Sequence, residues 1–397
     1  MEVLLLLQPN TENEKRNLKM LREEKVSLSL NGGQRFYVYA ASGGDEKSRG
    51  IYRFIFDADR GQLSSSSLVF GGINPLFMAI HPSGRYIYAT CNKRPFETPH
   101  KGRIYAFSIS EENGELVELC EVSSAGDTPC HISVDKKGLC SFVANYSSSS
   151  VASFQISSDG RLSEAVSVIC HEGSGEDPKR QEAPHPHSMT PDPTGSRVLA
   201  ADLGLDKIIS YGFDSGSGEL FSRESASTSL EPISGPRHLS FSPNSPFVYS
   251  ANELANTVTA FAYNLKKGSL SEIQTTKTIP NGFEGETYAS ELAVHPSGRF
   301  LYAANRGHDS IAAFKVNSED GTLRFVDVFK CGGAWPQHFQ IDPSGNFLLV
   351  TNKKSNEINI FRIEHETGVI SETGKKGQIE SPSCVCFKTY DKKNIIM

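Results

Sequence analysis

The chain has 397 residues, a formal net charge of −6 at pH 7 and 22% charged residues. This mildly acidic balance lacks the basic footprint of a general nucleic-acid binder, and no apolar run approaches the roughly 18 residues of a membrane span. The eight cysteines are scattered, mostly in apolar strand-like runs, which indicates free thiols in a reducing, cytoplasmic compartment and no metal site.

Residues 1–30 fit none of the patterns that follow, so we expect an N-terminal extension, either a flexible tail or a short helix around residues 14–25. Residues 31–397 are expected to form a single domain, because the same pattern repeats throughout them. The first β-rich run, Arg35–Ala41, resembles the second strand of the repeating unit described next.

A glycine turn recurs seven times along the chain, with about 50 residues from one copy to the next. Each copy follows an alternating, β-rich run such as Gly50–Phe56 or Thr257–Ala262. Glycine suits a tight hairpin turn because it adopts positive φ angles at little cost. The seven turn glycines are Gly61, Gly114, Gly160, Gly218, Gly268, Gly321 and Gly368.

A second turn lies earlier in each unit, and a short apolar strand such as Phe300–Ala304 follows it. Each unit thus offers four short strands and no helical period, which predicts an all-β, seven-bladed β-propeller with four-stranded blades. The last run, Pro382–Tyr390, resembles a first strand, so we expect it to complete the N-terminal blade and close the ring. The second-turn glycines are Gly84, Gly138, Gly195, Gly298 and Gly345, with a looser copy at Ser242–Ser245.

Two positions of each unit are expected to ring the mouth of the central channel. The first slot lies eight residues before the second turn's last residue, where the innermost strand begins, and the second slot lies eight residues after it, where the next strand ends. Because these strands are antiparallel, both slots fall on one face. The first slot holds Leu76, Cys130, His187, Arg237, Ser290, Gln337 and Ser383, and the second holds Asn92, Tyr146, Leu203, Glu253, Arg306 and Lys353.

The charged and titratable slot residues fall in consecutive units: His187, then Arg237 and Glu253, then Arg306. Singly, each has a structural explanation; Arg237 and Glu253, for example, could form an ion pair between neighbouring strands. Together around one opening they favour a ligand-binding site. The residues directly after the first slot are expected to support them from behind, and they include His131, His238, Glu291 and His338.

Residues 171–183 are an insertion that lengthens the third unit, and it contains Gly173 and Gly175. We expect a substrate-facing flap that carries Arg180 and Gln181 over the same rim as His187; the alternative is a solvated loop.

Several ordered motifs resemble the seven-bladed propeller lactonase family, which includes propeller-type 6-phosphogluconolactonases and the fungal 3-carboxy-cis,cis-muconate lactonising enzyme. The resemblance covers roughly residues 35–390. It implies that the His, two Arg and Glu proposed for the muconate enzyme correspond to His187, Arg237, Arg306 and Glu253. The last unit of the family often carries Arg after Trp-Pro, where this chain has Gln337, so one possible anion contact is missing. The matching motifs are HEGSG and RQEAPHPHS within 171–188, Gly235–His238, Asn252–Leu254, His295–Arg306 and Trp335–Phe339.

The resemblance implies hydrolysis of a sugar lactone, above all of 6-phosphogluconolactone to 6-phosphogluconate in the pentose phosphate pathway. We expect neither a cofactor nor a metal. A lactone carbonyl is already electrophilic, so a base that activates water and cations that stabilise the oxyanion suffice. Glu253 or His187 would be the base, and Arg237 and Arg306 would hold the anionic substrate and polarise its carbonyl. Further substrate contacts are expected from His185, Arg180, His238, Glu291, His338 and Lys353.

The sequence is also compatible with two other functions. One is a muconate-type cycloisomerase that runs lactone chemistry in the closing direction with the same residues, and the other is a non-catalytic propeller that binds a partner on its rim. The absence of G-x-S-x-G, HExxH and P-loop motifs argues against serine hydrolases, zincins and nucleotide hydrolases. The expected partner is a small anionic lactone, neither a nucleic acid nor a membrane, and the oligomeric state is left open.

Overall fold

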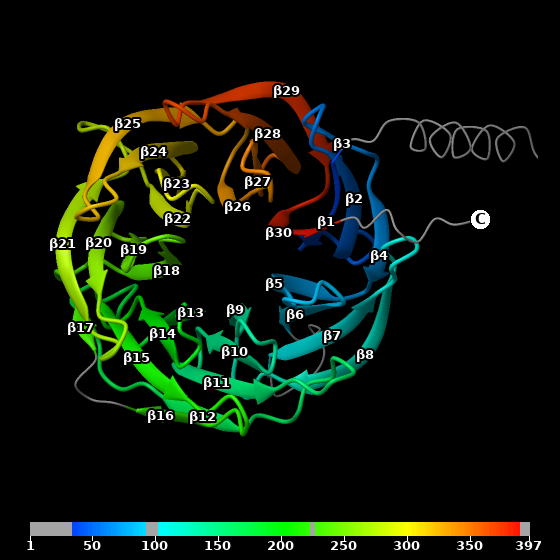
Figure 1. The fold of residues 1–397 in the computed structure, drawn as a ribbon, viewed down its shortest axis with the longest axis horizontal. Helices are drawn as coiled ribbons and strands as arrows, with labels where there is room; N and C mark the ends of the chain where they lie inside the picture. The colour runs from blue at the N-terminus through cyan, green and yellow to red at the C-terminus, as the bar shows by residue number, and fades with distance from the viewer. Residues whose placement is uncertain (1–33, 93–101, 223–226, 390–397) are drawn as a thin grey trace, which may run out of the picture. The chain divides into compact units, whose positions relative to one another are not determined.

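The computed structural model describes residues 34–92, 102–222 and 227–389, and these residues form strands and turns. Seven antiparallel sheets surround a common centre (Figure 1), as the repeats predict. None of the described residues belongs to a helix that is long and apolar enough to cross a membrane. The predicted extension, residues 1–30, lies outside the described ranges, so the domain boundaries stay a prediction.

Each blade is a sheet whose strands run outward in chain order from the channel. The innermost strands are β5 (Asn74–Ile80), β9 (Pro129–Val134), β13 (Pro186–Pro191), β18 (Pro236–Phe241), β22 (Tyr288–Val294), β26 (Pro336–Ile341) and β30 (Pro382–Thr389). The second strands are β6 (Tyr86–Asn92), β10 (Cys140–Asn145), β14 (Arg197–Asp202), β19 (Phe247–Asn252), β23 (Phe300–Arg306), β27 (Phe347–Asn352) and β1 (Arg35–Ser42). The third strands are β7 (Arg103–Ile109), β11 (Ser150–Gln155), β15 (Lys207–Phe213), β20 (Thr257–Tyr263), β24 (Ser310–Val316), β28 (Glu357–Ile363) and β2 (Gly50–Asp57). The outer strands are β8 (Leu116–Ser123), β12 (Ser167–Cys170), β16 (Leu220–Ser222) with β17 (Thr228–Ser229), β21 (Leu270–Lys277), β25 (Leu323–Lys330), β29 (Ile370–Gln378) and β3 (Gln62–Leu63) with β4 (Ser67–Gly71).

The C-terminal strand closes the ring, as predicted. β30 pairs antiparallel with β1, in a register that sets Val38 opposite Phe387, and so becomes the innermost strand of the first blade. Val385 is fully buried, and the ring of Phe387 packs edge-on against Phe36 and Phe56. This pairing removes the free edges that an open ring would expose.

Buried tyrosines join neighbouring blades. A tyrosine of the second strand donates its hydroxyl to the carbonyl of the turn glycine in the next blade, so the predicted glycine turns also serve the blade interface. At Gly368 the φ angle is 77° and a Cβ would collide with the ring of Phe300, so this turn requires glycine twice over. The pairs are Tyr39 with Gly114 (2.8 Å), Tyr88 with Gly160 (3.0 Å), Tyr249 with Gly321 (3.1 Å) and Tyr302 with Gly368 (3.0 Å).

Replacing Tyr302 by phenylalanine is expected to lower the free energy of unfolding by about 1–2 kcal/mol, because the buried carbonyl of Gly368 loses its donor. Urea unfolding of the wild type and the variant measures this difference. An unchanged unfolding midpoint would mean that the hydroxyl does not stabilise the blade junction.

A β-bulge interrupts each innermost strand at the mouth of the channel. In every blade the ladder between the first and second strands skips the first-slot residue; in β22 it skips Glu291 as well as Ser290. A bulge redirects side chains that strict alternation would send to opposite sides. Two successive residues can therefore serve the channel, as Arg237 and His238 do.

Candidate active site

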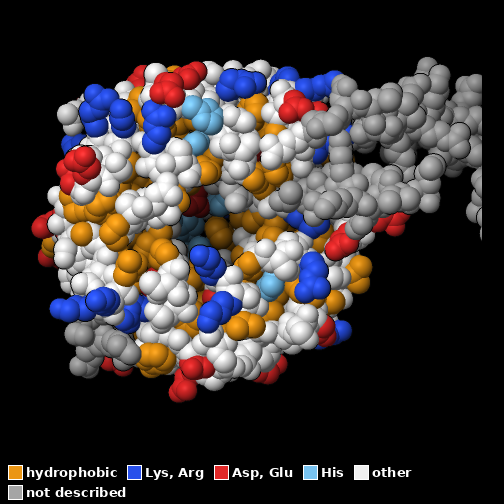
Figure 2. Space-filling model, viewed as in Figure 1, with side chains coloured by type: hydrophobic (Ala, Val, Ile, Leu, Met, Phe, Trp, Pro, Cys, Tyr) orange, Lys and Arg blue, Asp and Glu red, His pale blue; other side chains and the backbone are white. Residues whose placement is uncertain are grey.

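The predicted rim residues converge near the centre of the propeller. Figure 2 shows a hollow there, with acidic and histidine side chains inside it and basic side chains at its edge. The side chains come from the start of the innermost strands, the end of the second strands and the insertion 171–183, which lie at the same end of the channel.

Glu253, directly after β19, is at the centre of a charged cluster with Arg180, Arg237 and Arg306, which we call the hub. Its Oε2 lies 3.0 Å from Nε of Arg237 and 2.6 Å from Nη2 of Arg306, and its Oε1 accepts a hydrogen bond from Nη2 of Arg180 at 2.5 Å. The carboxylate is only 3% exposed. Both slots and the insertion thus meet at one carboxylate.

The pKa of Glu253 reflects these contacts. Burial alone would raise it, but the positive charges of Arg306 and Arg237 outweigh burial and hold the pKa well below its usual 4.5. Glu253 is therefore an ion at neutral pH. A carboxylate bound so tightly to three guanidiniums is a poor proton acceptor.

Two guanidinium donors of the hub have no hydrogen-bond acceptor. Nε of Arg237, Nε of Arg306 and Oε2 of Glu253 are buried and form no well-aligned hydrogen bond among the described residues, although Oε2 lies 3.0 Å from Nε of Arg237 and 2.6 Å from Nη2 of Arg306. A buried unpaired donor costs about 1–3 kcal/mol, and such groups are uncommon in folded proteins. Arg237 and Arg306 therefore retain donor capacity that their contacts with Glu253 do not use.

His187, the skipped residue of β13, is a buried neutral imidazole. Burial first, and then the charge of Arg237, lower its pKa well below 6.5. Its Nδ1 lies 3.7 Å from Sγ of Cys130, whose thiol donates to the carbonyl oxygen of His187 at 3.4 Å. The structure gives Nε2 no hydrogen-bond partner among the described residues. Burial raises the pKa of Cys130 to about 12, so this thiol is a poor nucleophile.

Buried polar contacts hold the insertion in place. His171 binds the carboxylate of Asp202 through Nδ1 at 2.5 Å and accepts from the hydroxyl of Tyr211 through Nε2 at 2.7 Å. The expectation that Gln181 would face the rim is wrong: its side chain is buried and donates to the carbonyl of Leu203 at 2.9 Å. Gln181 therefore shapes the insertion, whereas Arg180, its neighbour, reaches Glu253.

Aromatic side chains line this part of the rim. The guanidinium of Arg180 lies over the ring of Tyr288 at 5.3 Å, and His185 stacks on Tyr146 with ring centroids 4.3 Å apart. Neither tyrosine was predicted to belong to the site. Tyr146 occupies the second slot but is uncharged, and Tyr288, the first residue of β22, belongs to no motif.

A histidine layer, formed by Phe77, His131, His238, Glu291 and His338, lies against the hub. Oε2 of Glu291 binds Nδ1 of His238 at 2.9 Å and Nε2 of His338 at 3.3 Å, while the ring of Phe77 stacks on His131. Nε2 of His238 in turn faces Nη1 of Arg237 at 3.2 Å. The layer thereby orients Arg237 from behind. Among the described residues, no three of His, Cys, Asp and Glu are placed to hold a metal ion.

Positive charge predominates at the rim. Arg180, Arg237 and Arg306 pair with the carboxylate of Glu253, and the charge of Lys353 is felt by Arg306. Two further carboxylates lie at the outer edge, where one binds the predicted site residue His185 and the other accepts from a tyrosine. These outer pairs are Glu182 with His185 and Glu286 with Tyr288.

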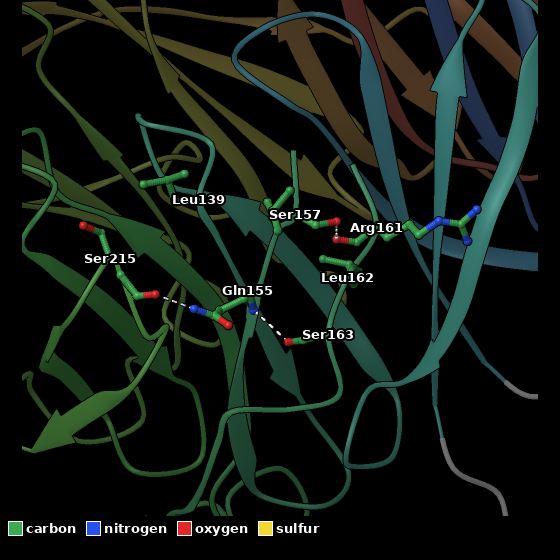
Figure 3. Close-up of a pocket in the computed structure, with 9 residues that line it drawn as sticks. Leu139, Gln155, Ser157, Arg161, Leu162, Ser163 and Ser215 are labelled. Atoms are coloured by element: carbon green, nitrogen blue, oxygen red, sulfur yellow. Dashed lines mark hydrogen bonds between the residues drawn. The ribbon is translucent and has the colours of Figure 1, made fainter. Parts of the chain in front are cut away.

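A surface pocket of about 390 Å³ lies elsewhere, beside β11 (Figure 3). Gln155, Arg161 and Ser215 contribute to its wall, and none of the predicted site residues does. Arg161 pairs with Asp159 there at 3.1 Å, so its charge is already compensated.

Known proteins resemble this chain over most of its length. Residues 37–387 match the family described as "Lactonase, 7-bladed beta-propeller". The 6-phosphogluconolactonase of Bacillus subtilis is 37% identical over 292 residues, which cover 74% of this chain and 81% of the relative.

Solved structures show the same relationship. The periplasmic gluconolactonase of Pseudomonas aeruginosa superposes with a TM-score of 0.84 at 30% identity, covering 90% of this chain and all of the other. A putative 6-phosphogluconolactonase of Bacteroides fragilis gives a TM-score of 0.81 at 30% identity, covering 89% of this chain and 98% of the other.

Proposed function

Because the chain belongs to the seven-bladed β-propeller lactonase family and is a lactone hydrolase, we propose that it hydrolyses 6-phosphogluconolactone to 6-phosphogluconate at the rim around Glu253. The observation that carries this proposal is the hub itself: one buried carboxylate, three arginines and two unpaired guanidinium donors. The proposal includes a place in the pentose phosphate pathway and a cytoplasmic location, with which the eight free cysteines agree.

His187 acts as the base in this reaction. Its neutral imidazole takes a proton from a water molecule through Nε2 while the water oxygen attacks the lactone carbonyl. The N–H groups of Arg237 and Arg306 stabilise the oxyanion of the tetrahedral intermediate. The ring C–O bond then breaks, and the imidazolium returns the proton to the leaving ring oxygen, which opens the sugar without a covalent enzyme intermediate.

Glu253 serves to orient the arginines instead of accepting the proton. Its low pKa disfavours protonation, and its contacts fix the three guanidiniums that a substrate would meet. At Glu253 itself three arginines meet one carboxylate, and Lys353 adds a further positive charge near Arg306. An excess of positive charge favours an anionic lactone, and a phosphorylated sugar above a neutral one.

The direct test is an assay of the purified protein with freshly generated 6-phosphogluconolactone, in which proton release is followed above the spontaneous rate. The proposal expects saturable acceleration that 6-phosphogluconate inhibits. Cyclisation of 3-carboxy-cis,cis-muconate without faster lactone opening would favour the cycloisomerase instead. No turnover of either substrate would favour a binding propeller.

Arg180 is expected to contribute substrate affinity, since its guanidinium binds Glu253 and lies over Tyr288 at the edge of the hub. Arg180→Met should raise KM by about tenfold and change kcat less, which corresponds to about 1.4 kcal/mol of binding energy. Lys179→Met is the matched control, because this exposed neighbour carries the same charge in the same insertion. Equal KM values for the two variants would contradict the role of Arg180.

A further inference from the structure

Among the rim cations Arg180, Arg237, Arg306 and Lys353, which lie in the described part of the chain, Lys353 alone forms no ion pair with Glu253. It follows β27 in the second slot of the blade formed by β26–β29, and its side chain is half-buried. The structure gives its ammonium group neither an ion-pair nor a hydrogen-bond partner among the described residues. Burial, and then the charge of Arg306, lower its pKa, so the group sits in a partly dehydrated, positive environment.

The charge of the rim is therefore unevenly compensated. Glu253 pairs with Arg180, Arg237 and Arg306, whereas no carboxylate of the described residues forms an ion pair with Lys353. The backbone keeps Lys353 in place, because its amide donates to the carbonyl of Trp335 at 3.0 Å. A half-buried cation without a counter-ion is a place where an anionic group would be stabilised.

We propose that Lys353 binds the phosphate group of the substrate, with the lactone carbonyl at the opposite side of the rim, beside His187 and Arg237. This inference rests on the proposed function and adds an orientation to it. In 6-phosphogluconolactone the carbonyl carbon and the carbon that carries the phosphate arm flank the ring oxygen. The arm lets the phosphate extend towards β27 while the carbonyl stays beside β13 and β18. Lys353 then determines specificity for the phosphorylated lactone and leaves the chemistry to His187 and the arginines.

The test compares two lactones, 6-phosphogluconolactone and unphosphorylated glucono-δ-lactone, with the wild type, Lys353→Met and Lys354→Met. Lys354 is the matched control: it carries the same charge, is exposed, and lies over the ring of Trp335 at 3.4 Å. We expect Lys353→Met to lower the kcat/KM ratio of the phosphorylated to the unphosphorylated lactone by about tenfold or more. Lys354→Met should preserve the wild-type ratio.

The outcomes separate this inference from the proposed function. A wild-type ratio near one would overturn the phosphorylated substrate itself, and the inference with it. A wild type that prefers the phosphorylated lactone, with Lys353→Met keeping that preference, would overturn only the role of Lys353. Equal loss on both lactones would assign Lys353 to the chemistry and also contradict the inference. Lys353→Gln and thermal unfolding of each variant establish that a change in the ratio does not come from misfolding.

Discussion

Replacing His187 by glutamine is expected to lower kcat by at least about a hundredfold, because water would lose its base. Glutamine keeps polar atoms near Cys130 but has no basic nitrogen. The pH profile of kcat/KM supplies a second signature. The wild-type rate should stay level through neutral pH and fall only at a pH well below 6.5, where His187 gains a proton and can no longer accept one.

The matched control is His81→Gln, which changes a histidine at the far end of an innermost strand. His81 binds the carbonyl of Gly138 and the hydroxyl of Ser83, so its role is in a turn. This variant should keep kcat within about twofold of the wild type. If His187→Gln retained wild-type kcat and the same acidic limb, another group would have to be the base.

Replacing Glu253 by glutamine is expected to have the largest effect on stability, together with a large effect on rate. The loss of its negative charge leaves Arg237, Arg306 and Arg180 facing one another without a counter-ion. Breaking such a buried arrangement costs about 3–5 kcal/mol, and we expect a loss near the lower end because Arg180 is partly exposed. Misplaced arginines should also lower kcat/KM by about a hundredfold. Urea unfolding and steady-state kinetics measure the two effects.

Glu357→Gln is the control for this stability effect. Glu357 is also buried, but within the described ranges its carboxylate has one ion-pair partner, Lys376, which lies 2.7 Å away with a half-exposed side chain. We expect a loss of less than about 1 kcal/mol there. If both variants were equally stable, Glu253 would not be the central counter-ion of the three arginines. In the wild type, the stabilisation by Glu253 should be complete above its unfolded pKa and should be lost only as the pH falls through its depressed folded pKa.

The sequence predicts the propeller well because the repeat is built from turns whose geometry demands particular residues. Gly321 and Gly368 have φ angles of 76° and 77°, and both receive a tyrosine hydroxyl from the preceding blade. Few other residues fit such a position, so glycine recurs at the same place in each repeating unit. Once the period is known, antiparallel pairing alone brings His187 and Glu253 to the same end of the channel.

What the sequence did not predict depends on local geometry. The bulges that let Arg237 and His238 both serve the channel have no residue signature, because the skipped position can be occupied by Leu76 as well as by His187. The inward orientation of Gln181 depends on the carbonyl of Leu203, in the turn after β14.

The proposed choice of His187 over Glu253 as the base could not be made from the sequence. It depends on how many guanidiniums surround each group, and only the folded arrangement brings Arg180, Arg237 and Arg306 to Glu253.

The most direct measurement is a crystal structure of the protein with 6-phosphogluconate, the product of the proposed reaction. The account predicts that the carboxylate of the product contacts Arg237 and Arg306 beside His187, while its phosphate contacts Lys353. A product molecule bound away from these residues, for instance in the surface pocket beside Arg161, would contradict the account.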